Sequence, residues 1–319
     1  MIPMDDLSSK QFLFIVGAPR SGTTWLFEML SEHPSVVSLK KELTLFSSYL
    51  AAPAKRFEDE VQRYEKHNWR QGLSLLYDRA DFERGMRSIV NDVYSRVLDL
   101  KPQATHILDK HPGYAQHLLL MDRLVPNCRF IHIIRDGREV AVSMMRAKRT
   151  MNFGAGEVKG AATDWATHVR AAMQAGKKLG ADRYHEVRYE DLMSGTTEHL
   201  EEIFRFAGLP VEHEQVNAIA SENQASKKLV SRGDPSLKAL RNVPGGIWKN
   251  KLALEERYLL DRYVGDLLCE LGYAEQGWWA LSILDRVRMS VYPLRVKAGE
   301  SLRALLRIWS SPIAGPPRR

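Results

Sequence analysis

A short stretch near the start of the chain, Phe12–Trp25, constrains the fold more than any other part of the sequence. Residues 12–16 are uninterruptedly apolar and predict a buried strand. Gly17 and Gly22 then frame a tight turn, and a helix is expected from Thr23. The first amides of a helix have no intrahelical partner, and the helix dipole is positive at that end. This arrangement therefore predicts a binding site for an anion such as a phosphate group.

The residues of this turn refine the expectation. Three hydroxyl side chains add hydrogen-bond donors: Ser21, Thr23 and Thr24. The spacing from Gly17 to Gly22 is that of a nucleotide P-loop, but Thr23 stands where a P-loop kinase has Lys, and the cation is Arg20 instead. The alternative interpretation is an ordinary tight strand-to-helix turn in an α/β protein.

The turn resembles the phosphosulfate loop of the sulfotransferase family, which has the pattern Pro-(Lys/Arg)-Ser-Gly-Thr-Thr-Trp. Residues Pro19–Trp25 match that pattern throughout. Members of the family transfer a sulfuryl group from 3′-phosphoadenosine-5′-phosphosulfate (PAPS) to an acceptor. The resemblance implies that the following residues bind this donor: Arg20, Ser21, Gly22, Thr23, Thr24 and Trp25.

Composition fits such a protein. The chain has 319 residues, of which 44% are hydrophobic and 27% charged, so it is long enough to bury a full core. Its net charge of +7 attracts anions in general. Because the Lys and Arg residues are spread along the chain and no nucleic-acid-binding module appears, we expect an anionic nucleotide rather than a nucleic acid as partner.

Apolar patterning predicts strands that alternate with helices. The strands are expected at 12–16, 36–39, 106–108, 129–134 and 184–187. The helices are expected at 23–32, 57–65, 82–98, 114–124, 137–146, 161–179, 196–207 and 254–271, with a glycine-bearing loop at 154–160. This alternation predicts an α/β fold with a central parallel sheet flanked by helices, and ligands bind beyond the carboxyl ends of such strands. Each motif singled out here follows a predicted strand.

A second phosphate motif follows the strand at 129–134. The family binds the 3′-phosphate with an Arg at a strand end and a Ser eight residues later, and Arg135 and Ser143 occupy those positions. The planar fork of an Arg suits phosphate oxygens. The alternative role for Arg135 is a salt bridge at the helix start with Asp136 or Glu139.

Two further segments resemble nucleotide contacts of the family. Val187–Leu192 resembles its Tyr-Glu-Asp-Leu motif, which implies that Tyr189 lies near the adenine; the alternative is a core tyrosine. We expect Glu190 and Asp191 to cap the next helix.

The segment 241–250 resembles the C-terminal nucleotide loop, and Arg241 and Trp248 match its binding positions. Asn242 and Val243 depart from the family's Lys-Gly, which predicts a weaker clamp. An ordinary surface loop is the alternative.

Transfer to a hydroxyl also needs a base for the departing proton. Carbohydrate- and tyrosine-directed members of the family use a Glu soon after the second strand, and Glu42 lies there, although Thr44 and Leu45 depart from the pattern. Cytosolic members use a His two residues beyond a Lys, but Pro112 stands at that position and His111 is one place off. Glu42 is therefore the first candidate for the base, and its alternative is a solvated surface carboxylate.

His111 is held in reserve as base or acceptor contact. Lys110 matches a Lys that relatives place on the bridging oxygen, where it and Arg20 would stabilise the leaving nucleotide.

We expect no metal, because a sulfuryl group carries less charge than a phosphoryl group and the histidines show no ligand spacing. Two rival functions remain open at this point. One is a P-loop-type nucleotide kinase or NTPase that needs Mg²⁺, and the other is a non-catalytic nucleotide-binding protein. The sequence does not name the acceptor, for which a sugar, a lipid and a small molecule all remain open.

We assign residues 1–273 to the catalytic domain and 274–319 to a basic amphipathic extension. The extension has three open roles: packing on the domain, contact between copies, and contact with an anionic membrane surface. No apolar run is long enough for a membrane span, no signal peptide is evident, and the two cysteines do not form a disulfide framework. We therefore expect a cytoplasmic protein that is at most peripheral to a membrane.

Overall fold

The computed structural model describes residues 5–69, 71–223 and 246–290. By its internal contacts the chain divides into two compact units, residues 1–251 and 252–319. The first unit holds the described residues of every predicted site motif. The proposed boundary near residue 273 stays a prediction.

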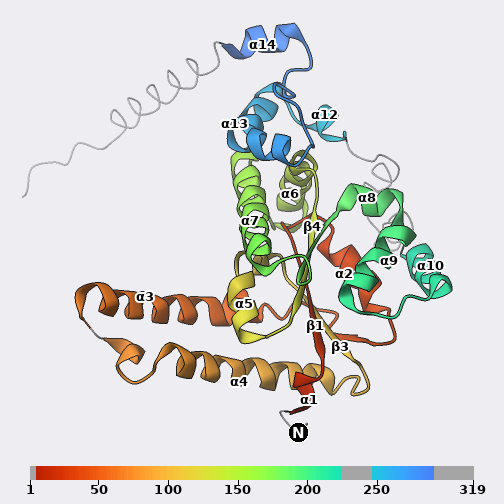
Figure 1. The fold of residues 1–319 in the computed structure, drawn as a ribbon. Coiled ribbons are helices and arrows are strands. Elements are labelled where there is room, and N and C mark those ends of the chain that lie inside the picture. Colours follow the sequence, from red (N-terminus) through yellow and green to blue (C-terminus); the bar gives the residue numbers. More distant parts are fainter. Residues whose placement is uncertain (1–4, 70, 224–245, 291–319) are drawn as a thin grey trace, which may run out of the picture. The chain divides into compact units, whose positions relative to one another are not determined.

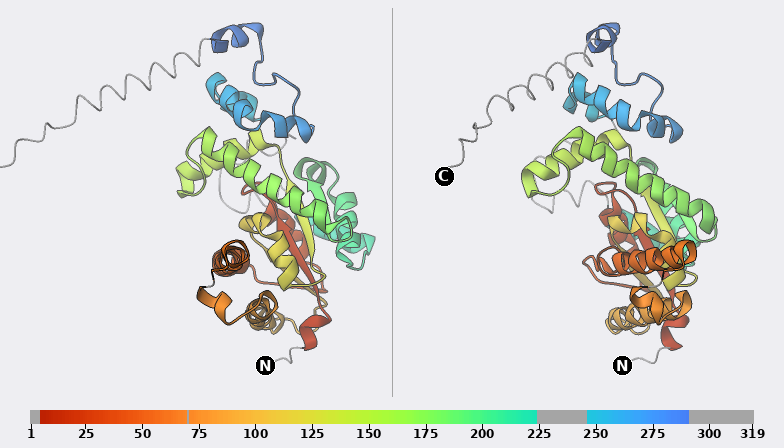
Figure 2. Two further views of the ribbon diagram at one scale, coloured as in Figure 1. Left: turned by 60° about the vertical axis from the view of Figure 1, so that its left-hand side comes forward. Right: turned by 90° about the vertical axis from the view of Figure 1, so that its left-hand side faces the viewer.

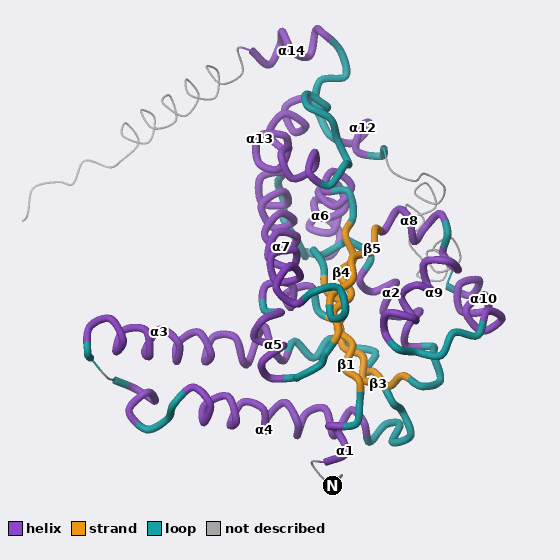
Figure 3. The backbone as a smooth tube through the Cα atoms, viewed as in Figure 1, coloured by secondary structure: helices purple, strands orange, loops and turns teal. Residues whose placement is uncertain are grey.

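The first unit is built on a five-stranded sheet with the order β2-β3-β1-β4-β5. All neighbouring strands run parallel. The strands are β1 (Gln11–Val16), β2 (Val36–Ser38), β3 (His106–Lys110), β4 (Arg129–Ile134) and β5 (Tyr184–Arg188). The predicted parallel sheet is thus confirmed, and Figure 3 shows its strands in the middle of the helices.

Helical segments follow the strands in chain order. Before and around the second strand lie α1 (Asp5–Ser8), α2 (Thr23–Ser31), the π-helical turn η1 (Leu45–Leu50), α3 (Ala51–His67), the 3-10 turn η2 (Gly72–Leu75) and α4 (Arg79–Leu98). After β3 come the 3-10 turn η3 (Pro112–Gln116), α5 (Leu118–Leu124), α6 (Gly137–Met151), α7 (Val158–Leu179), α8 (Tyr189–Ser194), α9 (Thr196–Ala207), α10 (His213–Glu222) and α12 (Trp248–Lys251).

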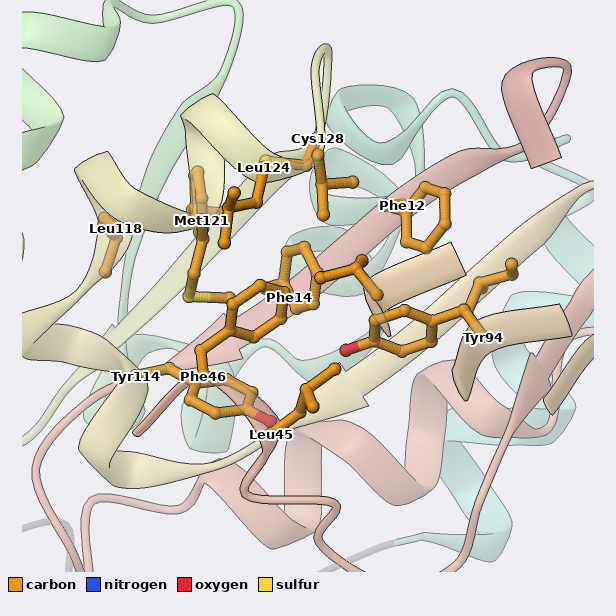
Figure 4. Close-up of a cluster of buried hydrophobic side chains, with 14 of the residues drawn as sticks. Phe12, Phe14, Leu45, Phe46, Tyr94, Tyr114, Leu118, Met121, Leu124 and Cys128 are labelled. Carbon is orange, nitrogen blue, oxygen red and sulfur yellow. The ribbon is translucent and has the colours of Figure 1, made fainter. Parts of the chain in front are cut away.

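The alternating side chains of β1 explain why both faces of the sheet are covered. Phe12 and Phe14 point into one core, shared with α4, α5 and α7 (Figure 4). Leu13 and Ile15 point into the other, shared with α2, α9 and α10. Successive side chains of a strand face opposite sides. A fully apolar strand therefore needs helices on both faces, as the sequence predicts.

Two predicted elements differ from the structure. The helix expected at 114–124 is interrupted at His117, whose φ of −129° and ψ of 13° are not helical, so η3 and α5 are separate. The tertiary contact of Tyr114, whose hydroxyl donates to the buried Asp109, holds η3 apart. The loop expected at 154–160 ends early because α7 begins at Val158, which packs into the core and overrides the low helix propensity of Gly160.

The long helices α3 and α4 form a hairpin that extends away from the sheet (Figures 1 and 2). Their facing sides are joined by Phe57 and Phe82, whose rings stack with centroids 4.1 Å apart. The two helices expected at 57–65 and 82–98 are thus both present, and the first is longer than predicted.

The second unit contains α13 (Leu254–Glu270) and α14 (Ile283–Ser290). Trp279 packs edge-on against Tyr258 of α13, with ring centroids 5.1 Å apart. Residues 291–319, most of the predicted extension, lie outside the described part of the chain. Among the residues that are described, no helix has the length and apolar character of a membrane span.

Candidate active site

The loop between β1 and α2 adopts the close-fitting shape that its glycines predict. Arg20 has a φ of 71° and Gly22 a φ of 100°, both in the left-handed region. A Cβ atom on Gly22 would come 2.5 Å from Cδ2 of Tyr189, so only glycine fits there. Gly22 is also the N-cap of α2 and supplies no side-chain hydrogen bond, so the first amides of the helix stay available for an anion.

Ser21 supplies a direct sign of an anion site in this loop. Its side chain is fully buried, and its Oγ has no hydrogen-bond partner among the described residues. A buried hydroxyl without a partner is costly and rare in folded proteins. A phosphate or sulfonate oxygen is an acceptor that would satisfy it, so the residues present fit a phosphorylated ligand.

Arg20, Arg135 and Ser143 lie together, although the sequence separates them by more than a hundred residues. Arg20 Nε donates to Ser143 Oγ over 3.1 Å, and Arg135 Nη1 donates to the Arg20 carbonyl over 3.2 Å. The Arg135 guanidinium lies 4.3 Å from the ring centroid of Tyr189, and its Nε is buried without a partner. Asp136 binds Arg138 instead, over 2.7 Å, so the salt bridge considered for Arg135 is not formed with Asp136.

Tyr189 also contacts the ring of Trp25 edge-on, with centroids 5.6 Å apart. Trp25 Nε1 donates to the carbonyl of Asn223 over 2.6 Å, so its indole already has a protein partner. Glu190 falls in the first turn of α8, and its Oε1 accepts from the Asp136 amide over 3.0 Å. Glu190 of α8 thereby holds the backbone at the start of α6 in place.

The C-terminal nucleotide motif is only partly described, because Arg241 lies outside the described residues. Trp248 is 3% exposed, and its amide donates to Glu139 Oε1 over 3.3 Å. The Arg138 guanidinium lies 4.4 Å from its ring centroid. From the sequence, Glu139 is expected only as a salt-bridge partner for Arg135. It proves to be 3% exposed, and burial raises the pKa of its carboxyl.

Glu42, Lys110 and His111 converge at the carboxyl ends of β2 and β3. Lys110 Nζ donates to Glu42 Oε1 over 2.5 Å and to Thr24 Oγ1 over 3.0 Å. His111 Nε2 lies 3.6 Å from Glu42 Oε2. One ammonium group thus joins the loop after β1 to the candidate base, whose side chain is 37% exposed, and the role of Glu42 stays a prediction.

Two residues that the sequence motifs do not indicate, Ser47 and Asp109, support this group. Ser47 Oγ hydrogen-bonds His111 Nδ1 over 3.1 Å, and burial lowers the pKa of His111. Asp109 is 3% exposed and accepts from the hydroxyls of Tyr94 and Tyr114 over 2.8 and 2.9 Å. Burial raises the pKa of Asp109. A lone carboxylate within an apolar strand, just before a Lys, was the available signal.

A pocket of about 690 Å³ opens beside this group. Its walls come from α2, from the segment after β2, and from the end of β3. Its lining residues are mostly polar or charged: Thr24, Phe27, Glu28, Ser31, Glu32, Lys40, Lys41, Glu42 and Lys110. Across the described ranges, no cluster of three or more His, Cys, Asp or Glu residues has the arrangement of a metal site.

Comparison with known proteins identifies the family. A model of the sulfotransferase family matches residues 13–213, which span the sheet, the loops and the candidate base. The chain belongs to the sulfotransferase family, and the resemblance that the sequence motifs indicated is confirmed.

Its relatives differ in size from this chain. An uncharacterized protein of Aquifex aeolicus is 28% identical over 256 residues, which are 78% of this chain and 31% of that protein. Protein-tyrosine sulfotransferase 2 of Gallus gallus is 26% identical over 198 residues, 62% of this chain and 51% of that protein. The chain thus spans about a third of the first relative's length and about half of the second's. A solved structure of mouse sulfotransferase SULT7A1 complexed with PAP is 16% identical, with 89% of this chain and 91% of that chain covered and a TM-score of 0.47.

Proposed function

We propose that this protein transfers a sulfuryl group from PAPS to a hydroxyl of an acceptor. The observation that carries the proposal is the placement of Lys110 Nζ, which binds Thr24 of the anion loop and Glu42, the candidate base, at once. A site for group transfer to a hydroxyl needs a cation at the leaving group and a base at the nucleophile, close together.

The donor's two phosphate-bearing ends match two groups of residues. The α2 amides, Ser21 Oγ and Thr23 would hold the 5′-phosphosulfate, and the orphaned Ser21 hydroxyl supports this assignment. Arg135 and Ser143 would hold the 3′-phosphate, and the unpartnered Nε of Arg135 supports it. Tyr189 and Trp248 would bound the nucleoside.

PAPS, when bound, supplies the sulfuryl group and a nucleotide leaving group. Glu42 would take the proton from the acceptor hydroxyl through Oε2, because Oε1 is engaged by Lys110. Lys110 and Arg20 would neutralise negative charge as it builds on the leaving oxygen. His111, 3.6 Å from Glu42 Oε2, is placed as the next contact for that proton or for the acceptor.

The pocket lining leaves the acceptor class open. Three carboxylates, three ammonium groups and two hydroxyls line it beside Phe27, and they offer hydrogen bonds to a polar acceptor. Apolar atoms, including those of the Lys and Glu stems, nevertheless form most of its exposed surface, which also suits a phenol or an acyl chain. A sugar, a lipid and a small molecule therefore all remain candidate acceptors. A cytoplasmic setting belongs to the same proposal, with which the free thiols of Cys128 and Cys269 agree.

Binding of 3′,5′-adenosine bisphosphate without metal tests the donor assignment. We expect this nucleotide to raise the melting temperature, because a ligand that binds only the folded state stabilises it by mass action. ATP with Mg²⁺ is the comparison that represents a kinase or NTPase. A shift with ATP and Mg²⁺ alone would contradict the proposal. Binding of the nucleotide without any transfer from labelled PAPS to a panel of acceptors would instead indicate a non-catalytic nucleotide-binding protein.

A further inference from the structure

The turn between α3 and α4 carries large apolar side chains that are exposed to solvent. Leu73, Leu75 and Leu76 are 50%, 55% and 82% exposed, and they are flanked by Trp69 at 64% and Tyr77 at 47%. Single exposed apolar residues are common on proteins, but a contiguous group of this kind marks an interaction surface. We name these five residues the hairpin tip.

The hairpin tip is held in a defined shape with its apolar side chains outward. Glu60 of α3 is only 6% exposed, and its Oε2 accepts from the Ser74 amide over 3.4 Å. Gly72 has a φ of 71°, and a Cβ there would come 2.3 Å from Glu60 Oε1. The amides of Leu76 and Tyr77 both bond to the Leu73 carbonyl over 3.0 Å. The backbone folds onto a buried carboxylate, and the leucines are left on the outside.

Charged side chains of both signs lie near the tip, and the carboxylates among them are engaged within the hairpin. Glu65 is bound by Arg79 over 2.9 Å, and the carboxylate of Asp78 caps α4. Arg63 and Lys66, in the last turns of α3, are exposed and make no ion pair with any described residue. Two exposed cations near the apolar group are thus left without an ion pair among the residues that the structure describes.

We propose that the hairpin tip docks on an anionic lipid bilayer. The leucines would enter the boundary of the acyl chains, Trp69 and Tyr77 would lie at the headgroups, and Arg63 and Lys66 would meet lipid phosphates. Figures 1 and 2 show the turn at the end of the hairpin farthest from the sheet. A projecting apolar tip reaches a deformable, flat surface without a matching groove. This inference goes beyond sulfuryl transfer and does not depend on it.

Flotation of the full chain with phosphatidylcholine vesicles, with and without phosphatidylserine, tests the proposal. We expect the double variant Leu75→Ser, Leu76→Ser to lower the partition coefficient about tenfold for each leucine that enters the bilayer. The matched control is Ile89→Ser, Leu100→Ser, which replaces one residue of α4 and one just after its end, 50% and 63% exposed and away from the tip. That control should bind as the unchanged chain does.

A second pair of substitutions tests the charge. Arg63→Gln with Lys66→Gln should weaken binding to the phosphatidylserine vesicles at low salt and leave the small binding at high salt unchanged. All these side chains are exposed, so the variants should melt at nearly the same temperature. Equal flotation of the tip variant and its control would overturn the proposal. Loss of self-association by light scattering, with vesicle binding intact, would also overturn it and assign the tip to a contact between copies.

Discussion

Arg135 offers the sharpest test of the nucleotide site, because its contribution to the stability of the ligand-free protein can be measured separately from its contribution to nucleotide binding. Among the described residues, its Nη1 donates to the Arg20 carbonyl over 3.2 Å and its guanidinium lies 4.3 Å from the ring centroid of Tyr189. Its Nε is buried and unpartnered. The substitution Arg135→Ala therefore removes about 1–2 kcal/mol of favourable contact and a desolvation cost of similar size.

These contributions to the stability of the free protein nearly cancel, so we expect the melting temperature of Arg135→Ala without ligand to change by less than about 4 °C. Binding should suffer far more. A charge-assisted hydrogen bond to phosphate contributes about 1.5–3 kcal/mol, which corresponds to a roughly 10- to 150-fold rise in Kd for 3′,5′-adenosine bisphosphate. Arg135→Lys should recover only part of the affinity, because it keeps the charge and loses the planar fork.

Calorimetric titration with 3′,5′-adenosine bisphosphate measures the effect. Arg129→Ala is the matched control, since Arg129 lies at the opposite end of the same strand, β4. It should bind the nucleotide as the unchanged chain does. If Arg135→Ala bound as tightly as the control, the assignment of the 3′-phosphate to this side chain would be wrong.

Four further predictions follow from the site and its surroundings. Glu42→Gln should lower kcat by about 10²–10⁴-fold with nucleotide affinity unchanged, measured beside the pocket control Glu28→Gln; normal turnover of Glu42→Gln together with an inactive His111→Ala would move the base to His111. Gly22→Ala should abolish nucleotide binding and lower the melting temperature, since its Cβ would press on Tyr189 at a φ of 100°; a variant that binds normally would contradict the fit of the loop. The free energy of unfolding should fall by about 2 kcal/mol between pH 7 and 5 through His132 alone, because burial lowers its folded pKa to about 3 while the unfolded pKa is about 6.5. The contribution of neutral His132 to stability is therefore present above the unfolded pKa and is lost as the pH falls below it. His132→Asn should weaken the pH dependence of the free energy of unfolding, measured by urea titrations at several pH values. Ile283→Ser with Leu284→Ser, at positions 80% and 73% exposed on α14, should weaken sedimentation with anionic vesicles if the C-terminal extension binds membranes, and equal sedimentation would leave it without that role.

Local patterns were sufficient for the donor loop. The run from Phe12 to Val16 predicts a strand buried on both faces, and Gly22 and Thr23 predict the turn and the helix start. These features depend on side-chain polarity and backbone freedom within a few residues. The helices α8 and α10 were not expected, because short helices carry weak periodicity. The interruption at His117 follows from the hydrogen bond of Tyr114 to the buried Asp109, which apolar periodicity does not reveal.

The sequence alone therefore determined the α/β fold, the shape of the loop after β1 and the family, because strand period, glycine positions and a contiguous motif are local properties. Only the tertiary structure brought Glu42 to Lys110, across 68 residues, because β2 and β3 are neighbours in the sheet and their carboxyl ends meet at one edge. The tertiary structure likewise shows that Asp136 pairs with Arg138 and not with Arg135, and that Tyr189 lies against Gly22. Such pairings depend on which strands lie side by side, and strand order is a property of the whole chain that no single segment encodes.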